Sequence, residues 1–116
     1  MENKITQLYA YQIADLLERK KIDPVILLEQ FIENYEKASN KVRYAFCKFL
    51  KKESLLEAEI SWKRQKDDNR LSIFDGIPTG WKDVIDIKNF PALAGSNLLL
   101  KTRINKIVKD ATVVTR

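Results

Sequence analysis

Histidine is absent from the 116-residue sequence, and cysteine occurs once. Without histidine, neither a Ser-His-Asp nor a Cys-His catalytic arrangement can form, and zinc or iron sites are disfavoured. Cys47 has no partner for an internal disulfide, and its apolar neighbours predict a small buried hydrophobic side chain. Any catalysis would have to use lysine, carboxylates, hydroxyls or backbone groups, so we expect neither a metal nor a cofactor.

Long apolar runs are absent too, and none approaches the ~20 residues that span a bilayer. The first residues lead into an amphipathic stretch rather than the apolar core of a signal peptide. We therefore expect a cytoplasmic protein without membrane attachment. Hydrophobic residues make up 45% and charged residues 32% of the sequence, which is enough apolar material for one domain over residues 1–116.

A strong charge of one sign is also missing. The net charge is +5, of which residues 1–70 contribute +2 and residues 71–116 contribute +3. The basic clusters Arg19–Lys21 and Lys51–Lys52 are short, and acidic residues lie around them. This pattern favours a solvated, lysine-rich surface, so nucleic acid is not expected as the main partner. Weak basic nucleic-acid binding is kept as a less favoured alternative.

Residues 1–70 contain no glycine and one proline, so we predict that they form a helical region. Within it, apolar side chains recur at the spacing of one helix face, which favours a packed core over a cofactor pocket. The three predicted helices lie around residues 5–17, 24–35 and 55–62.

Short-range signals place the ends of these elements. Thr6 is the predicted cap of the first helix. Asp23 followed by Pro24 predicts the start of the second, because aspartate caps well and proline fits the first helical position. Tyr44–Leu50 is short and aromatic, which predicts one strand.

Residues 71–116 differ in composition from residues 1–70, because all three glycines and two of the three prolines lie there. The apolar-rich run Trp81–Ile87 predicts a strand, and Phe90–Ser96 predicts a loop. Asp110 is the predicted cap of a last helix. The predicted fold class is therefore α+β, with amino-terminal helices followed by a few strands of a mixed sheet.

One lysine stands out in this second part. Lys82 follows the segment Asp75–Gly80 and has Trp81, Val84 and Ile85 as close neighbours in sequence. Apolar surroundings disfavour the charged form of a lysine, and a neutral lysine can act as a base near neutral pH. Lys82 is thus the candidate catalytic residue.

The motifs around Lys82 occur in an order that is specific even though each is weak alone. The sequence resembles the amidase signature family, which includes amide hydrolases and the A subunits of glutamyl-tRNA amidotransferases. This resemblance implies a layered α/β/α fold, of which this chain would supply a truncated, amino-terminal part. The motifs are Asp75-Gly76-Ile77-Pro78, Lys82-Asp83, Ile85-Asp86, Ala94-Gly95-Ser96 and Asp110-Ala111-Thr112-Val113-Val114.

The resemblance also implies a mechanism, which is hydrolysis of the carbon–nitrogen bond of amides by a Ser–cis-Ser–Lys triad. Lys82 matches the family's lysine, which serves as the base. The two serines of the family lie in a Gly-Ser-Ser-Gly setting, and none of the five serines of this chain has such neighbours. The glycines that form the family's oxyanion hole are absent as well. We therefore expect this chain to be inactive alone, with Lys82 as a vestigial base.

Two departures from the family pattern concern the surroundings of the lysine. Trp81 stands where the family has a smaller apolar residue, and residues 97–109 lack the family's proline-containing loop.

Asp83 and Asp86 lie three residues apart, so in a strand they would point to opposite faces. They are predicted to be structural caps or loop anchors rather than a general acid–base pair.

The alternative function is that of a protein-interaction module rather than of an amide hydrolase. The helical region 1–70 could pair with an amidotransferase or amidase partner subunit, or with a second copy of this chain. A truncated sheet would expose an edge and apolar faces, which favours such association or marginal stability.

Overall fold

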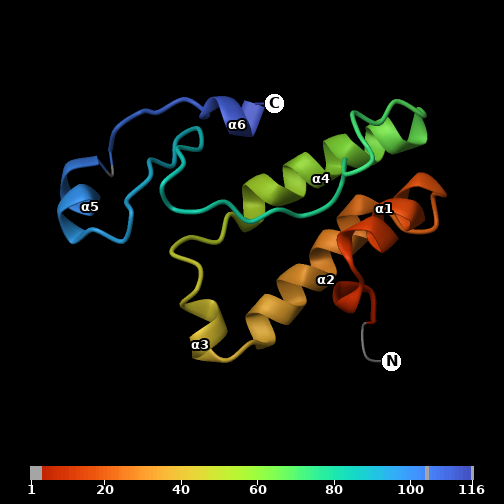
Figure 1. Ribbon diagram of the computed structural model, residues 1–116, viewed down its shortest axis with the longest axis horizontal. Helices are drawn as coiled ribbons and strands as arrows, with labels where there is room; N and C mark the ends of the chain where they lie inside the picture. The colour runs from red at the N-terminus through yellow and green to blue at the C-terminus, as the bar shows by residue number, and fades with distance from the viewer. Residues whose placement is uncertain (1–3, 104, 116) are drawn as a thin grey trace. The chain divides into compact units, whose positions relative to one another are not determined.

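The computed structural model describes residues 4–103 and 105–115, and helices are the regular structure in this part of the chain (Figure 1). The chain divides into two compact units, Met1–Thr79 and Gly80–Arg116. The first contains η1 (Lys4–Gln7), α1 (Ala10–Glu18), α2 (Pro24–Lys37), α3 (Asn40–Arg43) and α4 (Lys51–Lys66), and the second contains α5 (Asn97–Arg103) and α6 (Thr112–Thr115).

The α+β prediction is wrong. The described residues contain no strand and no sheet, and their only β feature is an isolated antiparallel bridge between Ile87 and Phe90. The expected layers of an α/β/α fold are therefore not formed by this part of the chain. None of the described helices combines the length and apolar character needed to cross a membrane.

The start of α2 follows the sequence signals. Asp23 is the N-cap, its Oδ1 accepts a hydrogen bond of 2.8 Å from the backbone N–H of Ile26, and Pro24 occupies the first turn. This confirms the predicted helix start. The prediction for Thr6 is wrong, because Thr6 lies in η1 and α1 begins only at Ala10. The Thr6 hydroxyl instead accepts a hydrogen bond of 2.7 Å from the side-chain amide of Asn34.

Helix α2 carries the core of the first unit on two of its faces. One face places Leu27 against Ile13 and Leu17 of α1, and Leu17 and Leu27 are fully buried. The other face places Leu28 and Ile32 against Ala58 of α4. Helix α4 accordingly packs against α2 (Figure 1). Burial of such aliphatic side chains contributes about 1.5–3 kcal/mol each, so α2 is the element that holds α1 and α4 together.

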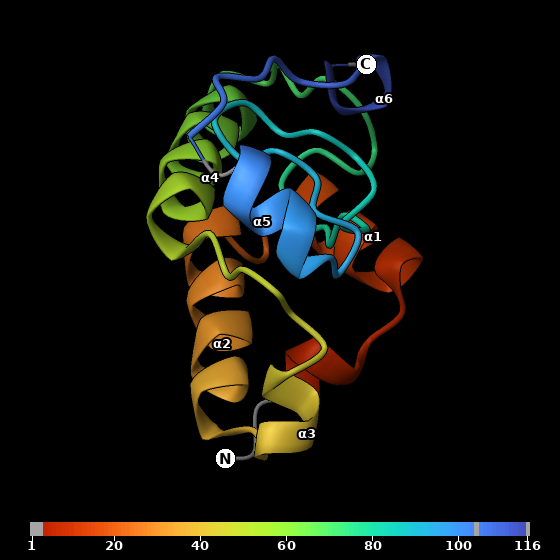
Figure 2. The same cartoon turned by 90° about the vertical axis from the view of Figure 1, so that its left-hand side faces the viewer.

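The predicted strand at Tyr44–Leu50 is a set of turns. The backbone N–H groups of Tyr44 and Phe46 donate to carbonyl groups of α3, which Figure 2 shows beside the carboxyl-terminal end of α2. The Phe49 ring stacks on Tyr35 of α2 with 4.0 Å between ring centroids, and Phe46 meets Tyr35 edge to face. The aromatic side chains thus pack on a helix instead of pairing strands.

Cys47, within the same turns, is exposed, so its predicted burial is also wrong. The segment turns Phe46 and Phe49 toward Tyr35, and each of the three rings contacts the other two.

Helix α4 is buried through polar as well as apolar side chains. Ser61 and Gln65 are each 4% exposed, whereas Leu56 and Ile60 are about half exposed. Gln65 donates from Nε2 to the backbone carbonyls of Leu17, at 2.6 Å, and Ile22, at 3.0 Å. The prediction of a helix here is confirmed, but its apolar residues do not form a continuous buried stripe.

A buried carboxylate ties the segment after α4 back onto that helix. The side chain of Asp75 is 5% exposed. Its Oδ1 accepts hydrogen bonds from the Ser61 hydroxyl at 2.8 Å and from Arg64 Nη2 at 2.6 Å, and its Oδ2 accepts from Arg64 Nε at 2.7 Å and from the backbone N–H of Leu71 at 3.0 Å. Arg64 therefore binds Asp75 in a bidentate manner, the strongest common geometry for such a pair.

Gly76 follows directly and has a positive φ of 96°. A Cβ atom at this position would lie 2.9 Å from Pro24 Cγ and 2.9 Å from the Ser61 hydroxyl oxygen. Glycine is needed here for both its backbone conformation and its small size. The Asp75-Gly76 pair thus packs the loop against the first residue of α2 and the middle of α4.

The hydrogen bonds from Arg64 hold the pKa of the Asp75 carboxyl well below its usual range, and burial opposes this effect only in part. The same hydrogen bond raises the pKa of the Arg64 guanidinium. A carboxyl group whose pKa is lower in the folded state stabilises the fold above its unfolded pKa of about 4. This stabilisation is lost as the pH falls from about 5 toward the folded-state pKa.

Replacing Asp75 is expected to destabilise the first unit in a pH-dependent way. Asp75→Asn removes the charge and leaves Arg64 without its partner, which should lower the free energy of unfolding by about 2–3 kcal/mol at pH 7. The difference from wild type should narrow as the pH is lowered from about 5 to about 2.5. Urea unfolding followed by far-UV circular dichroism measures both quantities. Asp67→Asn, an exposed acid at the end of α4, is the control and should have little effect. A difference that stays constant over this pH range would contradict the role given to the charge.

Candidate functional site

Lys82 lies in a loop of the second unit, and its side chain is exposed. Its backbone carbonyl accepts hydrogen bonds from the N–H groups of Val84, at 2.8 Å, and Ile85, at 3.0 Å, which makes a tight turn instead of the predicted strand. Trp81 is 40% exposed and Val84 is 60% exposed. The structure therefore does not place Lys82 in the dry, apolar surroundings expected from its neighbours in sequence.

The amino group of Lys82 makes no ion pair and no hydrogen bond with other residues that the structure describes. The hydroxyls of Ser61, Ser72 and Ser96 are engaged elsewhere. Ser61 donates to Asp75, and Ser96 accepts a hydrogen bond of 3.3 Å from the N–H of Leu99 at the start of α5. No serine therefore connects to Lys82 within residues 4–103 and 105–115, and the catalytic role of Lys82 stays a prediction.

Asp83 anchors the loop that follows. Its Oδ1 accepts a hydrogen bond of 2.9 Å from the N–H of Leu93, and its Oδ2 accepts one of 3.2 Å from the N–H of Gly95. The backbone carbonyl of Asp83 accepts a third, of 2.7 Å, from the N–H of Ala94. Residues 93–95 are thus fastened to a single aspartate.

Asp86 does the same for the other end of this loop. Its Oδ1 accepts a hydrogen bond of 2.7 Å from the N–H of Ala92, and both of its oxygens lie 3.2–3.3 Å from Nη2 of Arg103 on α5. Arg103 Nη1 also donates to the carbonyl of Ala92 at 2.8 Å. The prediction that Asp83 and Asp86 are loop anchors is confirmed.

Electrostatics agrees with this structural role for Asp86. The hydrogen bond from the Ala92 N–H is the main reason that the pKa of the Asp86 carboxyl is lowered, and Arg103 adds to the effect. Asp86 therefore stays ionised at neutral pH and acts as an acceptor rather than as a general acid.

Asp110 has a different partner from the one predicted. Its Oδ1 accepts a hydrogen bond of 2.7 Å from the backbone N–H of Lys88, and α6 begins only at Thr112. The N–H of Ala111 donates to the carbonyl of Asp86 at 2.9 Å. The prediction of a helix in this region is confirmed, but Asp110 ties it to the loop after Lys82 instead of capping it.

The sequence reasoning missed Arg103. This residue lies 17 positions after Asp86, in α5, and the pairing depends on where that helix forms. The remaining expectation for this segment, a loop at Phe90–Ser96, is confirmed, and only Ala92 is buried within it. Groups of three or more residues suited to hold a metal ion are not found in the described part of the chain.

Comparison of the sequence with known protein families identifies the family of this chain. Residues 26–116 match the model of the Amidase family, so most of the chain, including Lys82 and both anchoring aspartates, is covered. The chain belongs to the Amidase family.

Among curated proteins, the chain is similar to the A subunit of glutamyl-tRNA(Gln) amidotransferase from Tropheryma whipplei strain Twist, with 26% identity over 98 residues. It is also similar to the corresponding protein of Clostridium botulinum strain Hall, with 28% identity over 96 residues. Each alignment covers 82% of this chain but only 18% or 19% of the relative, so the chain spans about a fifth of the length of these proteins. No solved structure matches the chain.

Two neighbouring residues are expected to respond differently to replacement by alanine. Asp83→Ala removes the acceptor of the Leu93 and Gly95 N–H groups, so hydrogen–deuterium exchange of residues 93–95 should speed up by about tenfold, the equivalent of about 1.4 kcal/mol. Lys82→Ala, whose side chain is exposed and unpaired in the described structure, should change exchange there by less than about twofold. Mass spectrometry of the peptide that holds residues 90–97 measures this. Equal protection in Asp83→Ala and wild type would rule out the anchoring role.

Proposed function

We propose that this chain is the lysine-bearing, amino-terminal segment of an amide-hydrolysing domain, with Lys82 as its general base. The match to the Amidase family over residues 26–116 supports this proposal, because the matched region includes Lys82. The order of the short motifs around Lys82 supports it further.

The chemistry of the proposed reaction explains what this segment does and does not supply. By resemblance, the lysine takes a proton through a bridging serine while a second serine attacks the amide carbonyl. A lysine works as a base when it is neutral, and burial next to suitable partners favours that state. In the described structure Lys82 is exposed and no serine is connected to it. The chain alone is therefore proposed to be inactive.

The observation that carries the proposal is the contrast between Lys82 and its neighbours. Asp83 and Asp86 are fully engaged with backbone N–H groups of residues 92–95, while the amino group of Lys82 remains without a partner in the described residues. Hydrogen bonds between residues of this loop thus fix its backbone, and the side chain of Lys82 is exposed to solvent. This arrangement suits a base that meets its serines only when a further glycine- and serine-rich segment covers it.

A chimera tests the role of Lys82. Residues 26–116 would replace the matching region of the Clostridium botulinum relative, and ammonia release from glutamine and acetamide would be measured. An active chimera should lose activity about 1,000-fold or more on Lys82→Ala, because residues of a catalytic unit act together. Lys88→Ala, also exposed and in the same loop region, is the matched control and should keep the activity. A chimera that stays active with Lys82→Ala would refute the assignment.

The isolated chain should release no ammonia from glutamine or acetamide above the buffer rate, since it lacks both serines of the proposed triad. Turnover by the isolated chain that disappears on Lys82→Ala would overturn the proposal that it is inactive alone.

A second candidate function, an interaction module, is favoured by one observation on α4. Leu56 and Ile60 lie one helical turn apart and are 53% and 50% exposed. Such an apolar pair on a lysine-rich helix suits contact with another protein surface. The proposed partner is a second copy of this chain or a subunit of an amidotransferase or amidase.

Self-association is the direct test of this module. Sedimentation velocity should show a dimer that becomes more populated at higher protein concentration, because burial of the two side chains favours association. The double variant Leu56→Ser and Ile60→Ser should remain monomeric, whereas Lys63→Ser, on the same helix, should associate like wild type. A wild-type chain that is monomeric throughout would count against self-association and leave only a different protein as partner.

A further inference from the structure

The net positive charge of the chain lies in one short segment of the first unit. Residues 41–52 hold five of the 21 basic residues and none of the 16 acidic ones, so the rest of the chain carries equal numbers of both signs. We call residues 41–52 the basic segment. It comprises most of α3, the turns that follow and the start of α4. Its basic residues are Lys41, Arg43, Lys48, Lys51 and Lys52.

The basic segment is exposed over most of its length. Every residue from 41 to 48 is exposed, and so are residues 51 and 52. Two aromatic side chains stand among these cations. Tyr44 is 81% exposed, and Phe46 is 44% exposed. Exposed aromatic rings between basic residues are typical of surfaces on which unpaired bases stack while cations contact the phosphates.

The fold gathers the basic segment around the carboxyl-terminal end of α2. Phe46 meets the ring of Tyr35 edge to face, and the guanidinium of Arg43 lies 5.9 Å from the centroid of the same ring. Lys51 Nζ lies 2.6 Å from the carboxylate of Glu36, the next residue of α2. Figure 2 shows α3 beside this end of α2. Residues from both ends of the basic segment therefore belong to one surface.

Much of this positive charge is not neutralised within the fold. Lys41, Arg43 and Lys52 make no ion pair with a carboxylate of the described residues. The end of a helix carries only about half a negative charge, and Lys37 already lies in the last turn of α2. The helix end thus does not account for the cations around it. Clustered, uncompensated cations attract polyanions.

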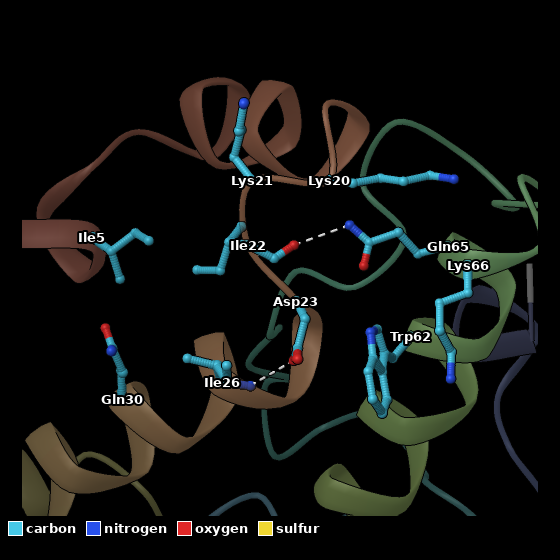
Figure 3. Close-up of a pocket in the computed structure, with 10 residues that line it drawn as sticks. All are labelled: Ile5, Lys20, Lys21, Ile22, Asp23, Ile26, Gln30, Trp62, Gln65 and Lys66. Carbon is cyan, nitrogen blue, oxygen red and sulfur yellow. Dashed lines mark hydrogen bonds between the residues drawn. The ribbon is translucent and has the colours of Figure 1, made fainter.

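The other basic cluster of this unit, Arg19–Lys21, is arranged differently. Two of its three charges are paired with carboxylates. The cluster lies beside an open cavity of about 380 Å³ next to Trp62, and Figure 3 shows the amino groups of Lys20 and Lys21 extending away from it. The cavity therefore does not collect positive charge. Lys21 is exposed and lies outside the basic segment, which makes it a suitable control position.

We propose that the basic segment binds single-stranded nucleic acid. The phosphates would contact its cations, and the bases would stack on Tyr44 and on the exposed part of Phe46. Stacking of this kind requires unpaired bases, so the proposed ligand is single-stranded. This binding surface is separate from Lys82 and does not depend on amide hydrolysis by the chain.

An anionic membrane surface shares the phosphate chemistry but fits the basic segment less well. Peripheral attachment commonly uses an amphipathic helix that lays an apolar face into the lipid. Helix α3 has only four residues, and the rest of the exposed part consists of turns.

Two strands with the same phosphates test the proposal on the unmodified chain. One is a fluorescein-labelled oligothymidylate of about twelve nucleotides, and the other is an abasic strand of equal length. Fluorescence anisotropy in about 50 mM salt should show saturable binding of oligothymidylate and about tenfold weaker binding of the abasic strand. For oligothymidylate, the logarithm of the binding constant should fall with the logarithm of the salt concentration with a slope of about −2 to −3, as for three or four phosphate contacts.

A pair of double variants locates the cations. Lys41→Gln combined with Lys52→Gln should weaken oligothymidylate by about tenfold and make the salt slope less steep by about 1.4. Lys21→Gln combined with Lys63→Gln removes the same charge from exposed positions of the same unit. This control should change the affinity by less than about twofold.

Tyr44→Ala tests the stacking contact. It should weaken oligothymidylate by about fivefold or more and leave the abasic strand unchanged, because the ring contacts bases and not phosphates. Tyr11→Ala, at a tyrosine of α1 that is 68% exposed, is the control and should leave both strands unchanged. The ratio of the two affinities is measured within one variant, so it does not depend on a difference in stability.

The proposal is overturned if oligothymidylate shows no saturable binding in about 50 mM salt, or if the abasic strand binds as tightly. It is equally overturned if the control pair of lysine variants weakens binding as much as the pair in the basic segment. Vesicles with about 30% phosphatidylserine should leave the chain in the supernatant after sedimentation. Binding to these vesicles without binding to oligothymidylate would assign the surface to anionic lipid instead.

Discussion

The buried carboxylate of Asp75 is the interaction on which the first unit depends. It receives Ser61 and Arg64 from α4 and the N–H of Leu71 from the following loop, so one side chain joins a helix to the segment that leaves it. Gly76 then packs against Pro24 and Ser61, where the Cβ atom of any other residue would lie only 2.9 Å from each. The apolar contacts of α2 bring α1 and α4 together, and Asp75 decides where the chain goes next. A buried charge of this kind is favourable only because every partner is in place.

In the second unit, aspartate side chains also hold the backbone through hydrogen bonds, but Asp86 is more exposed than Asp75. Asp83 and Asp86 accept the N–H groups of residues 92–95, which a sheet would otherwise satisfy, and Arg103 completes the arrangement. Asp83 and Asp86 are therefore structural here, whereas the side chain of Lys82 is exposed. The loop that carries Lys82 is held in order by the two aspartates and Arg103, without any hydrogen bond or ion pair from the Lys82 side chain among the described residues.

Of the three helix caps predicted from local sequence, Asp23 is confirmed and Thr6 and Asp110 are wrong, and neither predicted strand forms. The start of α2 could be predicted because a cap and a proline act within about four residues of chain. Tyr44–Leu50 has the composition of a strand, but a strand needs a partner strand, and Tyr35 offers its aromatic residues a helix surface instead. The burial of Ser61 and Gln65 in α4 was hidden for the same reason, since their partners Asp75, Leu17 and Ile22 lie 14 to 48 residues away.

The sequence by itself determined the family, the helical character of residues 1–70, the start of α2 and the motif that contains Lys82, because these rest on short patterns of neighbouring residues. Only the tertiary structure decided that Lys82 and Cys47 are exposed, that no sheet forms among the described residues, and that Arg103 binds Asp86. The same holds for the cavity beside Trp62. Burial and long-range pairing depend on which surfaces meet, and no local pattern of residues specifies that meeting.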